Sequence, residues 1–231
     1  MVEGLFRRQQ LHAAGPADRL TAVPNGGALE LVAIVESMVQ LPLDGPVWNS
    51  VFTVAPLTIV GTVEEDGSID LAPKHMAMPL GWDNYFCFVC SPRHATQRNA
   101  QRTGQFTVSF PRPGDVIETS MAAAGRDDEG DKPGLQAIAT FDATAVEGPL
   151  VTDAYLWLEC ELDRVVDGYG ENSLIIGRIA AAAVADDSVR RAEDDDADLI
   201  AQAPMLAYVS PGRFARITQT YSFPFPADFS R

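Results

Sequence analysis

The stretch SPRHATQRN, residues 91–99, places cations and hydroxyl groups where a helix is expected to begin. Ser91 and Pro92 predict this start, because serine caps helix N-termini and proline fits the first helical position. That end of a helix favours acidic side chains, since its unpaired N–H groups and the macrodipole are positive. Arg93 and His94 follow instead, in a chain with 32 acidic residues against 17 lysines and arginines. A bound anion would remove this electrostatic conflict.

Thr96 and Asn99 extend the same pattern. Being three residues apart, they share one side of the predicted helix. An anion held between Ser91, Arg93, Thr96 and the first-turn amides would suit these residue types. The alternative is a surface helix whose cations pair with distant acids, because exposed charges cost little. Spacing alone leaves both interpretations open.

Other kinds of site chemistry find little support in the sequence. Cys87 and Cys90 are three residues apart in one predicted strand, where an odd spacing turns side chains to opposite faces. There is no second cysteine pair and the three histidines are scattered, so we predict no metal site. The sequence also has no Gly-x-Ser-x-Gly elbow, no Gly-x-Gly-x-x-Gly loop and no Walker-type loop.

Composition excludes several classes of partner. With 231 residues and 46% hydrophobic content, the chain is long enough for one domain with a sizeable core. A net charge of −15 argues against binding to nucleic acid or to anionic membrane surfaces. No stretch resembles a membrane span or a signal peptide. Three cysteines, an odd number in apolar surroundings, predict reduced thiols and a cytoplasmic protein.

The elements that must position these residues are mostly strands. Residues 1–27 predict an extended arm, and 28–41 predict an amphipathic helix or, alternatively, a buried strand. Apolar and β-branched runs then predict strands at 51–63, 69–80, 84–90, 105–110, 139–146, 155–168 and 172–185. Residues 64–68 predict a hairpin turn, Gly104 ends the helix, 186–198 predict an exposed loop or helix start, and 212–226 predict a strand or tail. This succession favours an antiparallel barrel.

Four motifs in order along the chain resemble the flavin reductase-like family of FMN-binding split barrels. They are APLTIVGTVEEDGSIDLAPKHMAMPL, FCFVCSPRHATQRNAQRTGQFTVSFP, DKPGLQA and LECELDRVVDGYGENSLIIGRI, within residues 51–180. The resemblance implies a mainly β fold, an antiparallel, Greek-key-like FMN-binding split β-barrel with short peripheral helices. It places an N-terminal arm and helix at 1–45, the split-barrel domain at 46–185, and a C-terminal extension packing on the barrel at 186–231.

The resemblance also implies a cofactor site. The FMN phosphate would sit at the helix start, and the flavin ring would lie along the strand end that carries APKHMAM, residues 72–78. The matching positions are Ser91, Arg93, His94, Thr96 and Asn99 for the phosphate, and Lys74, His75, Met76 and Ala77 for the ring. His75 is equally interpretable as a structural histidine, and one of the two methionines Met76 and Met78 is expected in the core.

The sequence departs from the family at three points. Lys74 and His75 stand where members often have an aromatic residue and a serine, and Ser109 replaces a common asparagine. Asn172 occupies a position where reductase members often carry histidine, near the nicotinamide side of the flavin. The last departure bears on reduction by nicotinamide more than on FMN binding.

The function implied is that of an FMN-dependent oxidoreductase. We expect an NAD(P)H-dependent flavin reductase that passes hydride from nicotinamide to flavin, with NADH or NADPH as co-substrate, because the cofactor itself supplies the difficult chemistry. An FMN-binding electron carrier without nicotinamide activity is the alternative. The expected partners are a second copy of the chain, with the flavin near the interface, and a monooxygenase that uses the reduced flavin.

Overall fold

The computed structural model describes residues 38–128 and 130–226. The chain divides into two compact units, Met1–Ser50 and Val51–Arg231. Within the first unit the described part contains one short 3-10 helix, η1 (Val47–Asn49). Residues 28–37 of the predicted helix or strand at 28–41 lie outside the described residues, so that prediction stays open.

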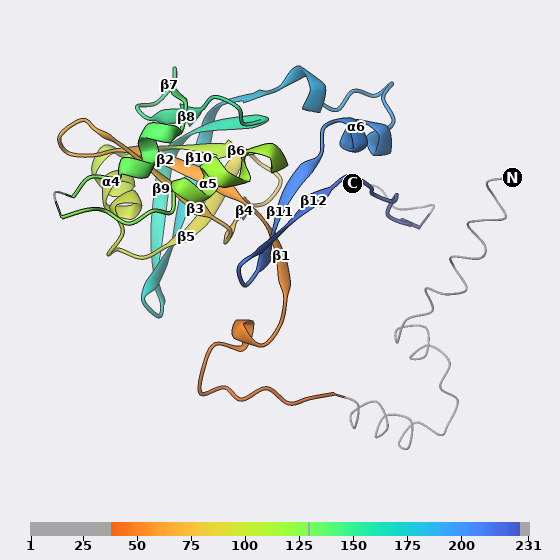
Figure 1. The fold of residues 1–231 in the computed structure, drawn as a ribbon, viewed down its shortest axis with the longest axis horizontal. Helices are drawn as coiled ribbons and strands as arrows, with labels where there is room; N and C mark the ends of the chain where they lie inside the picture. Colours follow the sequence, from red (N-terminus) through yellow and green to blue (C-terminus); the bar gives the residue numbers. More distant parts are fainter. Residues whose placement is uncertain (1–37, 129, 227–231) are drawn as a thin grey trace, which may run out of the picture. The chain divides into compact units, whose positions relative to one another are not determined.

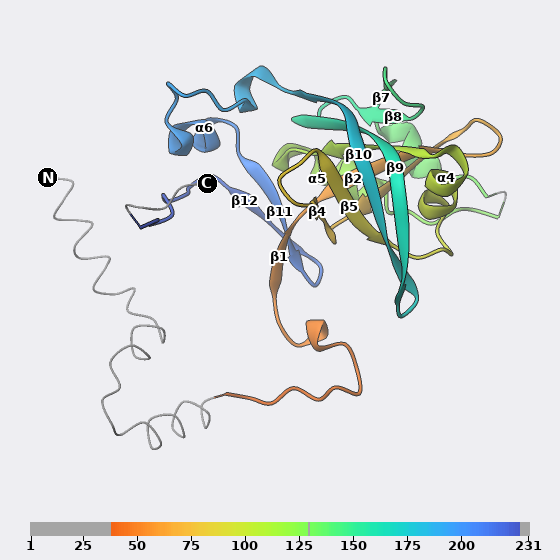
Figure 2. The ribbon, with the colours of Figure 1, turned by 180° about the vertical axis from the view of Figure 1, so that it is seen from behind.

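The second unit is built on a seven-stranded antiparallel sheet (Figures 1 and 2). The strand order is β3-β2-β6-β9-β10-β5-β4. The bounds are β2 (Thr58–Val63), β3 (Ile69–Lys74), β4 (Ala77–Pro79), β5 (Tyr85–Cys90), β6 (Gln105–Phe110), β9 (Leu156–Tyr169) and β10 (Asn172–Val184). The prediction of a mainly β, antiparallel fold is confirmed.

A two-residue bend turns this sheet into a barrel. The predicted strand at 69–80 is interrupted at His75 and Met76, which separate β3 from β4. These two strands stand at opposite ends of the strand order. A connection this short can join them only if the sheet curls until its edges approach. The bend at His75 and Met76 therefore lies where the two edges of the barrel meet, which is beside the candidate site.

The predicted strand at 51–63 also divides, because its two halves join different sheets. Its first half is β1 (Thr53–Pro56), which pairs with β11 (Met205–Ser210). Strand β12 (Arg213–Ile217) pairs with the other side of β11 and completes a three-stranded sheet. Pro56 lacks a backbone N–H and ends the pairing of β1, after which β2 enters the main sheet.

The barrel core is formed by apolar side chains from facing strands. Phe86, Phe88 and Phe106 are fully buried, and the rings of Phe88 and Phe106 meet edge to face with centroids 5.2 Å apart. Gly177 lies under Phe106, where a Cβ atom would come within 2.4 Å of the ring carbon Cζ. The side chains predicted to share one face of β6, those of Phe106, Val108 and Phe110, pack against this core.

Short helices surround the sheets. They are α4 (Ala95–Thr103), α5 (Val116–Met121), α6 (Asp196–Gln202), η2 (Pro113–Asp115), η3 (Pro133–Ala137) and η4 (Asp186–Ser188). A small hairpin of β7 (Thr140–Asp142) and β8 (Pro149–Val151) adds a third sheet. Gly67 forms the predicted hairpin turn with φ of 86°, and Gly104 ends α4 in the left-handed region, as predicted.

Candidate functional site

Two segments that the sequence assigned to one site come together in the structure. The β3–β4 bend lies beside the end of β5, where the Val89 N–H donates to the Met76 carbonyl at 2.8 Å. The Lys74 amino group also lies close enough to the Cys90 thiol, one residue before Ser91, for this neighbour to raise its pKa. The fold therefore brings the predicted ring segment, 74–77, next to the start of the predicted phosphate segment.

Helix α4 begins later than the sequence predicted. Its first helical residue is Ala95, and Pro92, Arg93 and His94 form a turn before it. The Ser91 carbonyl accepts from the His94 N–H at 2.9 Å, and the Ser91 hydroxyl accepts from the Arg93 N–H at 3.3 Å. Serine here stabilises the turn rather than capping the α-helix, so the basic residues precede the first helical turn.

The start of α4 has no cap within the described part of the chain. His94 is the N-cap residue and makes no side-chain capping bond. No hydrogen bond is formed by the backbone N–H groups of residues 95–97 with the described residues. The first turn holds no acidic side chain. Several N–H donors thus stand unpaired at a positive helix end, as in anion sites of other proteins.

Arg93 stands beside this helix end and is largely exposed. Its guanidinium pairs with Glu171 at 2.7 Å, and both side chains are more than two-thirds exposed to solvent. Arg98 donates to the Arg93 carbonyl at 2.5 Å. Exposed pairs contribute at most about 1 kcal/mol, so a multiply charged ligand can replace Glu171 at small cost.

Thr96 and Asn99 do share one side of α4, but that side faces the sheet. Both side chains are buried. The Thr96 hydroxyl donates to Asp70 Oδ2 at 3.2 Å, and the Asn99 amide donates to the Thr62 hydroxyl at 3.2 Å. In this structure the two side chains pack against the sheet, and their contact with an anion stays a prediction. Their backbone positions remain at the helix end.

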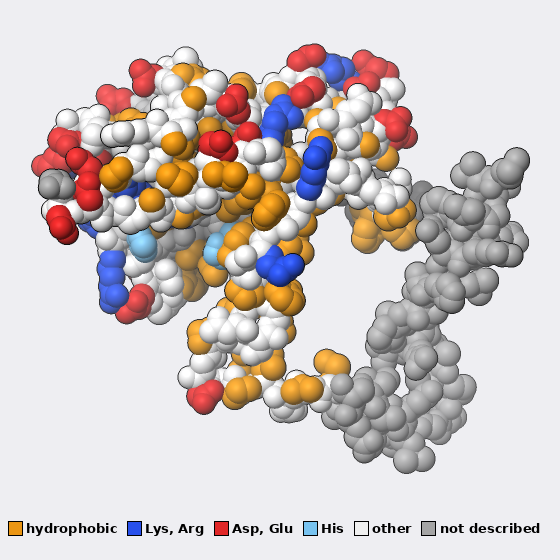
Figure 3. Space-filling model, in the orientation of Figure 1, with side chains coloured by type: hydrophobic (Ala, Val, Ile, Leu, Met, Phe, Trp, Pro, Cys, Tyr) orange, Lys and Arg blue, Asp and Glu red, His pale blue; other side chains and the backbone are white. Residues whose placement is uncertain are grey.

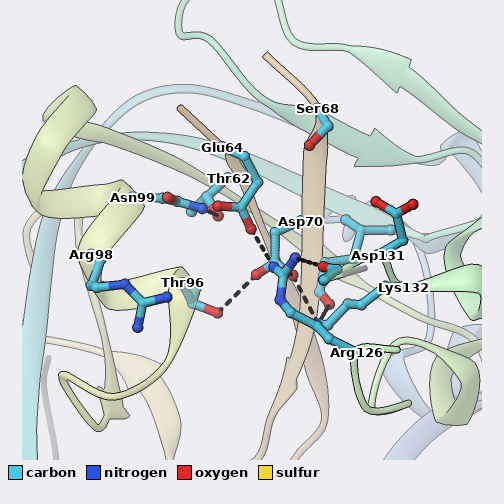
Figure 4. A network of polar contacts seen from close by, with 12 residues as sticks. Thr62, Glu64, Ser68, Asp70, Thr96, Arg98, Asn99, Arg126, Asp131 and Lys132 are labelled. Atoms are coloured by element: carbon cyan, nitrogen blue, oxygen red, sulfur yellow. Dashed lines mark hydrogen bonds and ion pairs between the residues drawn. The ribbon is translucent and has the colours of Figure 1, made fainter. Parts of the chain in front are cut away.

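A buried carboxylate beside Thr96, that of Asp70, is a feature that sequence reasoning missed (Figure 4). Asp70 on β3 is 1% exposed and pairs with Lys132 at 2.8 Å and Arg126 at 3.2 Å. Arg126 also pairs with Glu64. The run at 125–132 is rich in acidic residues, a composition typical of solvated surface, yet its two cations pair with Asp70 and fasten this loop to β3. The alternation of Asp70 with apolar neighbours on a strand was the available signal.

The side chains of the β3–β4 bend differ in exposure. Burial lowers the pKa of Lys74 most, although the neighbouring Cys90 raises it. Burial also lowers the pKa of His75, with Lys74 adding to the effect, and the His75 ring packs on Tyr208 of β11 at 4.6 Å. Ala77 belongs to the core, whereas Met76 and Met78 are both about half exposed, which contradicts the expectation that one is core packing. Only the backbone of Ala77 can face a ligand.

Asn172 lies at the first position of β10, close to the Arg93 side of the site. It is exposed and pairs with Tyr169 across the hairpin that joins β9 and β10. The preceding residue is Glu171, the partner of Arg93. A nearby buried atom also lacks a partner among the described residues, the Gln97 side-chain oxygen. The Gln97 amide nitrogen donates to the Ser173 hydroxyl at 3.2 Å.

The residues at this site fit a flavin mononucleotide. Unpaired amides, Arg93 and the Ser91 hydroxyl can donate to a phosphate. The exposed Met76 and the partly buried His75 give an apolar surface for a ring beside the donor Lys74. The unpartnered Gln97 oxygen is able to accept from a ribityl hydroxyl. Among the described residues no group of histidine, cysteine or acidic side chains could hold a metal ion, and no helix could cross a membrane.

Comparisons with known proteins agree with this fold. The family model for the flavin reductase like domain matches residues 52–214. An uncharacterized protein of Methanothermobacter thermautotrophicus is 24% identical over 155 residues, 65% of this chain and 73% of its own. Flavoredoxin from Methanosarcina acetivorans has a TM-score of 0.67 at 18% identity, covering 83% of this chain and 97% of that one. Nitrilotriacetate monooxygenase component B from Bacillus cereus gives 0.69 at 17%, covering 81% and 99%.

The fold also matches a structure from Shewanella frigidimarina described as a flavin reductase with split barrel domain. Its TM-score is 0.65 at 16% identity, and the match covers 75% of this chain and 87% of that one. At such low identity these structures establish the fold, which confirms the predicted split barrel. Because the family model spans most of the chain, from β1 to β12, this protein belongs to the flavin reductase-like family.

Proposed function

We propose that this protein is an FMN-binding oxidoreductase that takes hydride from NADH or NADPH. The observation that carries the proposal is the uncapped start of α4, where unpaired N–H groups stand beside Arg93. A dianionic phosphate suits this place because it can accept from the amides and from the guanidinium at once. Membership of the flavin reductase-like family supports flavin as the molecule that carries this phosphate.

Each segment of the site then has a defined task. Ser91, Arg93 and the first turn of α4 bind the phosphate, and the β3–β4 bend orients the ring. His75 remains neutral near pH 7 because its pKa is lowered, and its packing on Tyr208 fixes the bend. FMN, when bound, supplies the chemistry of hydride acceptance at N5, so the site needs no side chain that transfers a proton to it.

An FMN-binding electron carrier is the second candidate. Asn172 favours it, because the histidine often found at this position in reductase members is missing. One of the similar folds is named flavoredoxin, and another is described as an FMN-binding protein from Thermus thermophilus. Both candidates require the same FMN site and differ only in the electron donor.

A homodimer and a monooxygenase partner belong to the same proposal. Large apolar side chains are exposed on the three-stranded sheet, with Val54 71% and Phe214 54% exposed, and hydrophobic atoms are visible along β1 in Figure 3. The last three residues of β10, 182–184, are also apolar and exposed. A second copy would cover such surface. The similarity to a monooxygenase component supports a monooxygenase as user of the reduced flavin, and three free cysteines support a cytoplasmic location.

Anaerobic spectroscopy of the full chain tests the donor. Protein loaded with FMN is mixed with NADH or NADPH, and the flavin absorbance is followed. Bleaching by one of the two establishes the reductase. Binding of FMN without bleaching by either establishes the electron carrier instead. Failure to bind FMN at all contradicts both candidates.

A further inference from the structure

A cavity lies apart from the candidate flavin site, between the segment before β9, η4, α6 and the start of β11. Its volume is about 250 Å³. Tyr155, Leu199, Ile200, Ala203 and Met205 supply its mainly apolar wall. None of its lining residues belongs to 74–77 or 91–99. The cavity is therefore a separate feature of the second unit, formed largely by the chain that follows the main barrel.

The size of the cavity limits what can occupy it. Close-packed interiors leave few voids larger than a water molecule. An apolar cavity of about 150 Å³ in another protein remains dry and binds benzene, and drug-sized ligands need about 300–1,000 Å³. The cavity here, at about 250 Å³, suits a single substituted ring and is too small for a three-ring flavin.

Charges beside the cavity argue against an anionic occupant. Arg190 and Asp196 form a two-pronged pair, with Nε–Oδ1 at 2.9 Å and Nη2–Oδ2 at 2.8 Å. Both side chains are more than half exposed, so this pair is weak and does not by itself exclude an ion. A neighbouring hollow that shares Leu199 with this cavity is lined by an excess of acidic residues over the single cation Arg191, and this negative charge opposes an anion.

Tyr155 and Ser188 bring hydroxyl groups to a mainly apolar wall, and the Ser188 hydroxyl already donates to Asp187 Oδ1 at 3.0 Å. Burial raises the pKa of the Tyr155 phenol, so the hydroxyl stays protonated near neutral pH. Its ring is held edge to face against Phe110, with centroids 5.9 Å apart. The hydroxyl forms no hydrogen bond with the residues that the structure describes. A neutral phenol can both donate to and accept from a ligand.

We infer that this cavity is a second ligand site, which takes a neutral monocyclic aromatic molecule carrying one hydroxyl or carbonyl group. The apolar walls bind the ring, Tyr155 pairs with the polar substituent, and the excess of acidic residues beside the cavity disfavours anionic analogues. The site does not depend on flavin binding, because it shares no residue with the proposed flavin site.

The test uses the full chain with ¹³C-methyl methionine and benzyl alcohol as the neutral probe, with benzoate as its anionic analogue. The chain has 6 methionines, and Met205→Leu assigns the one in the cavity. We expect benzyl alcohol to shift the Met205 signal saturably, with and without FMN, while benzoate binds at least about tenfold more weakly. Met76 and Met78, on the flavin side, should not move.

Two alanines of the same region provide a matched pair of variants. Ala203 is buried in the cavity wall, whereas Ala201 is exposed on α6. Ala203→Met fills the cavity and should lower the affinity for benzyl alcohol at least about tenfold. Ala201→Met should bind benzyl alcohol with the affinity of the parent protein. Equal binding by both variants overturns the inference. The inference is also overturned if the Met205 signal of the parent protein does not shift, or if its shift does not saturate, and this measurement needs no variant to fold. Equal affinity of the parent protein for benzoate and benzyl alcohol overturns it as well.

Discussion

Two ion-pair groups stand on either side of the start of α4, and they differ in burial. Arg93 and Glu171 pair in solvent, with both side chains more than two-thirds exposed. Asp70, by contrast, is 1% exposed and pairs with Arg126 and Lys132 under the helix, while Thr96 donates to its second oxygen. Both groups pair a carboxylate with basic side chains near the start of α4, but one pair lies in solvent and the other group lies in the protein interior, where the dielectric constant is lower.

The difference separates binding from stability. An exposed pair contributes little, so its members can exchange partners when a ligand arrives. In a buried group the charges of the carboxylate and the two cations balance one another. Removing one of them leaves the others buried without a partner, which lowers the free energy of unfolding strongly. Arg93 is therefore available to a phosphate, whereas Asp70 holds the 125–132 loop and α4 against β3.

Asp70→Asn should produce the largest effect. It removes the only buried negative charge opposite Lys132 and Arg126 among the described ion pairs. We expect the free energy of unfolding to fall by about 3–5 kcal/mol. Urea denaturation measures this change. The matched control is Glu171→Gln, which should cost at most about 1 kcal/mol. Equal losses for the two variants would contradict the distinction drawn between the pairs.

Arg93→Ala should lower the affinity for FMN strongly and leave the free energy of unfolding nearly unchanged. A charge-assisted hydrogen bond to phosphate contributes about 1.5–3 kcal/mol, so FMN affinity should fall about ten- to a hundredfold. Riboflavin, which lacks the phosphate, should bind the variant as it binds the parent. Fluorescence titration of both flavins into both proteins measures the contrast. A similar loss for the two flavins would disprove the phosphate assignment at 91–99.

Much of this arrangement follows from sequence patterns. Alternating and β-branched residues predicted most of the main strands, and Gly104 predicted the end of α4, because these signals act within a few residues. Strand β11 was missed, since residues 205–210 pair with β1 about 150 positions away along the chain and have no local partner except β12. Pairing between distant segments leaves no trace in local periodicity.

The sequence brought the two segments of the candidate site together correctly, but it did not predict how their side chains are directed. The unusual charge at 91–99 indicated the region, and the structure brings it next to the bend at 74–77. The direction of Thr96 and Asn99 could not be predicted, because the helix start was placed three residues too early and Asp70 was not recognised as a partner. A helix shows which residues share a side, but only packing decides which side is buried.

Thr96→Val should lower stability without changing flavin selectivity. The hydroxyl donates to buried Asp70, and a lost bond of this kind to a charged acceptor costs about 1.5–3 kcal/mol at most. We expect the midpoint of urea denaturation to fall while the ratio of FMN to riboflavin affinity stays unchanged. If that ratio drops tenfold, the Thr96 side chain turns toward the phosphate when the ligand binds.

Glu171→Gln should increase FMN affinity. Glu171 competes with the phosphate for Arg93, and its removal also takes one negative charge from the neighbourhood. Because exposed pairs contribute at most about 1 kcal/mol, the gain should be about two- to fivefold. Riboflavin affinity should be unaffected. In the Arg93→Ala background the gain should disappear, and a gain of equal size there would show that Glu171 acts on the ligand directly.

Asn172→His should give the smallest change in FMN affinity and a measurable change in kcat/KM for the nicotinamide. Asn172 follows Glu171 on the exposed hairpin, so it can contact a second substrate without touching the pair that holds the phosphate. Histidine can stack on a ring and, when protonated, attract phosphates, whereas asparagine only hydrogen-bonds. We expect kcat/KM for the reactive nicotinamide to rise about two- to threefold, with FMN affinity unchanged within about a factor of three. Stopped-flow bleaching of bound FMN by NADH and by NADPH measures both proteins. If only the Asn172→His protein is bleached, the parent protein is an electron carrier, and the expectation that hydride transfer needs no side chain at this position is wrong.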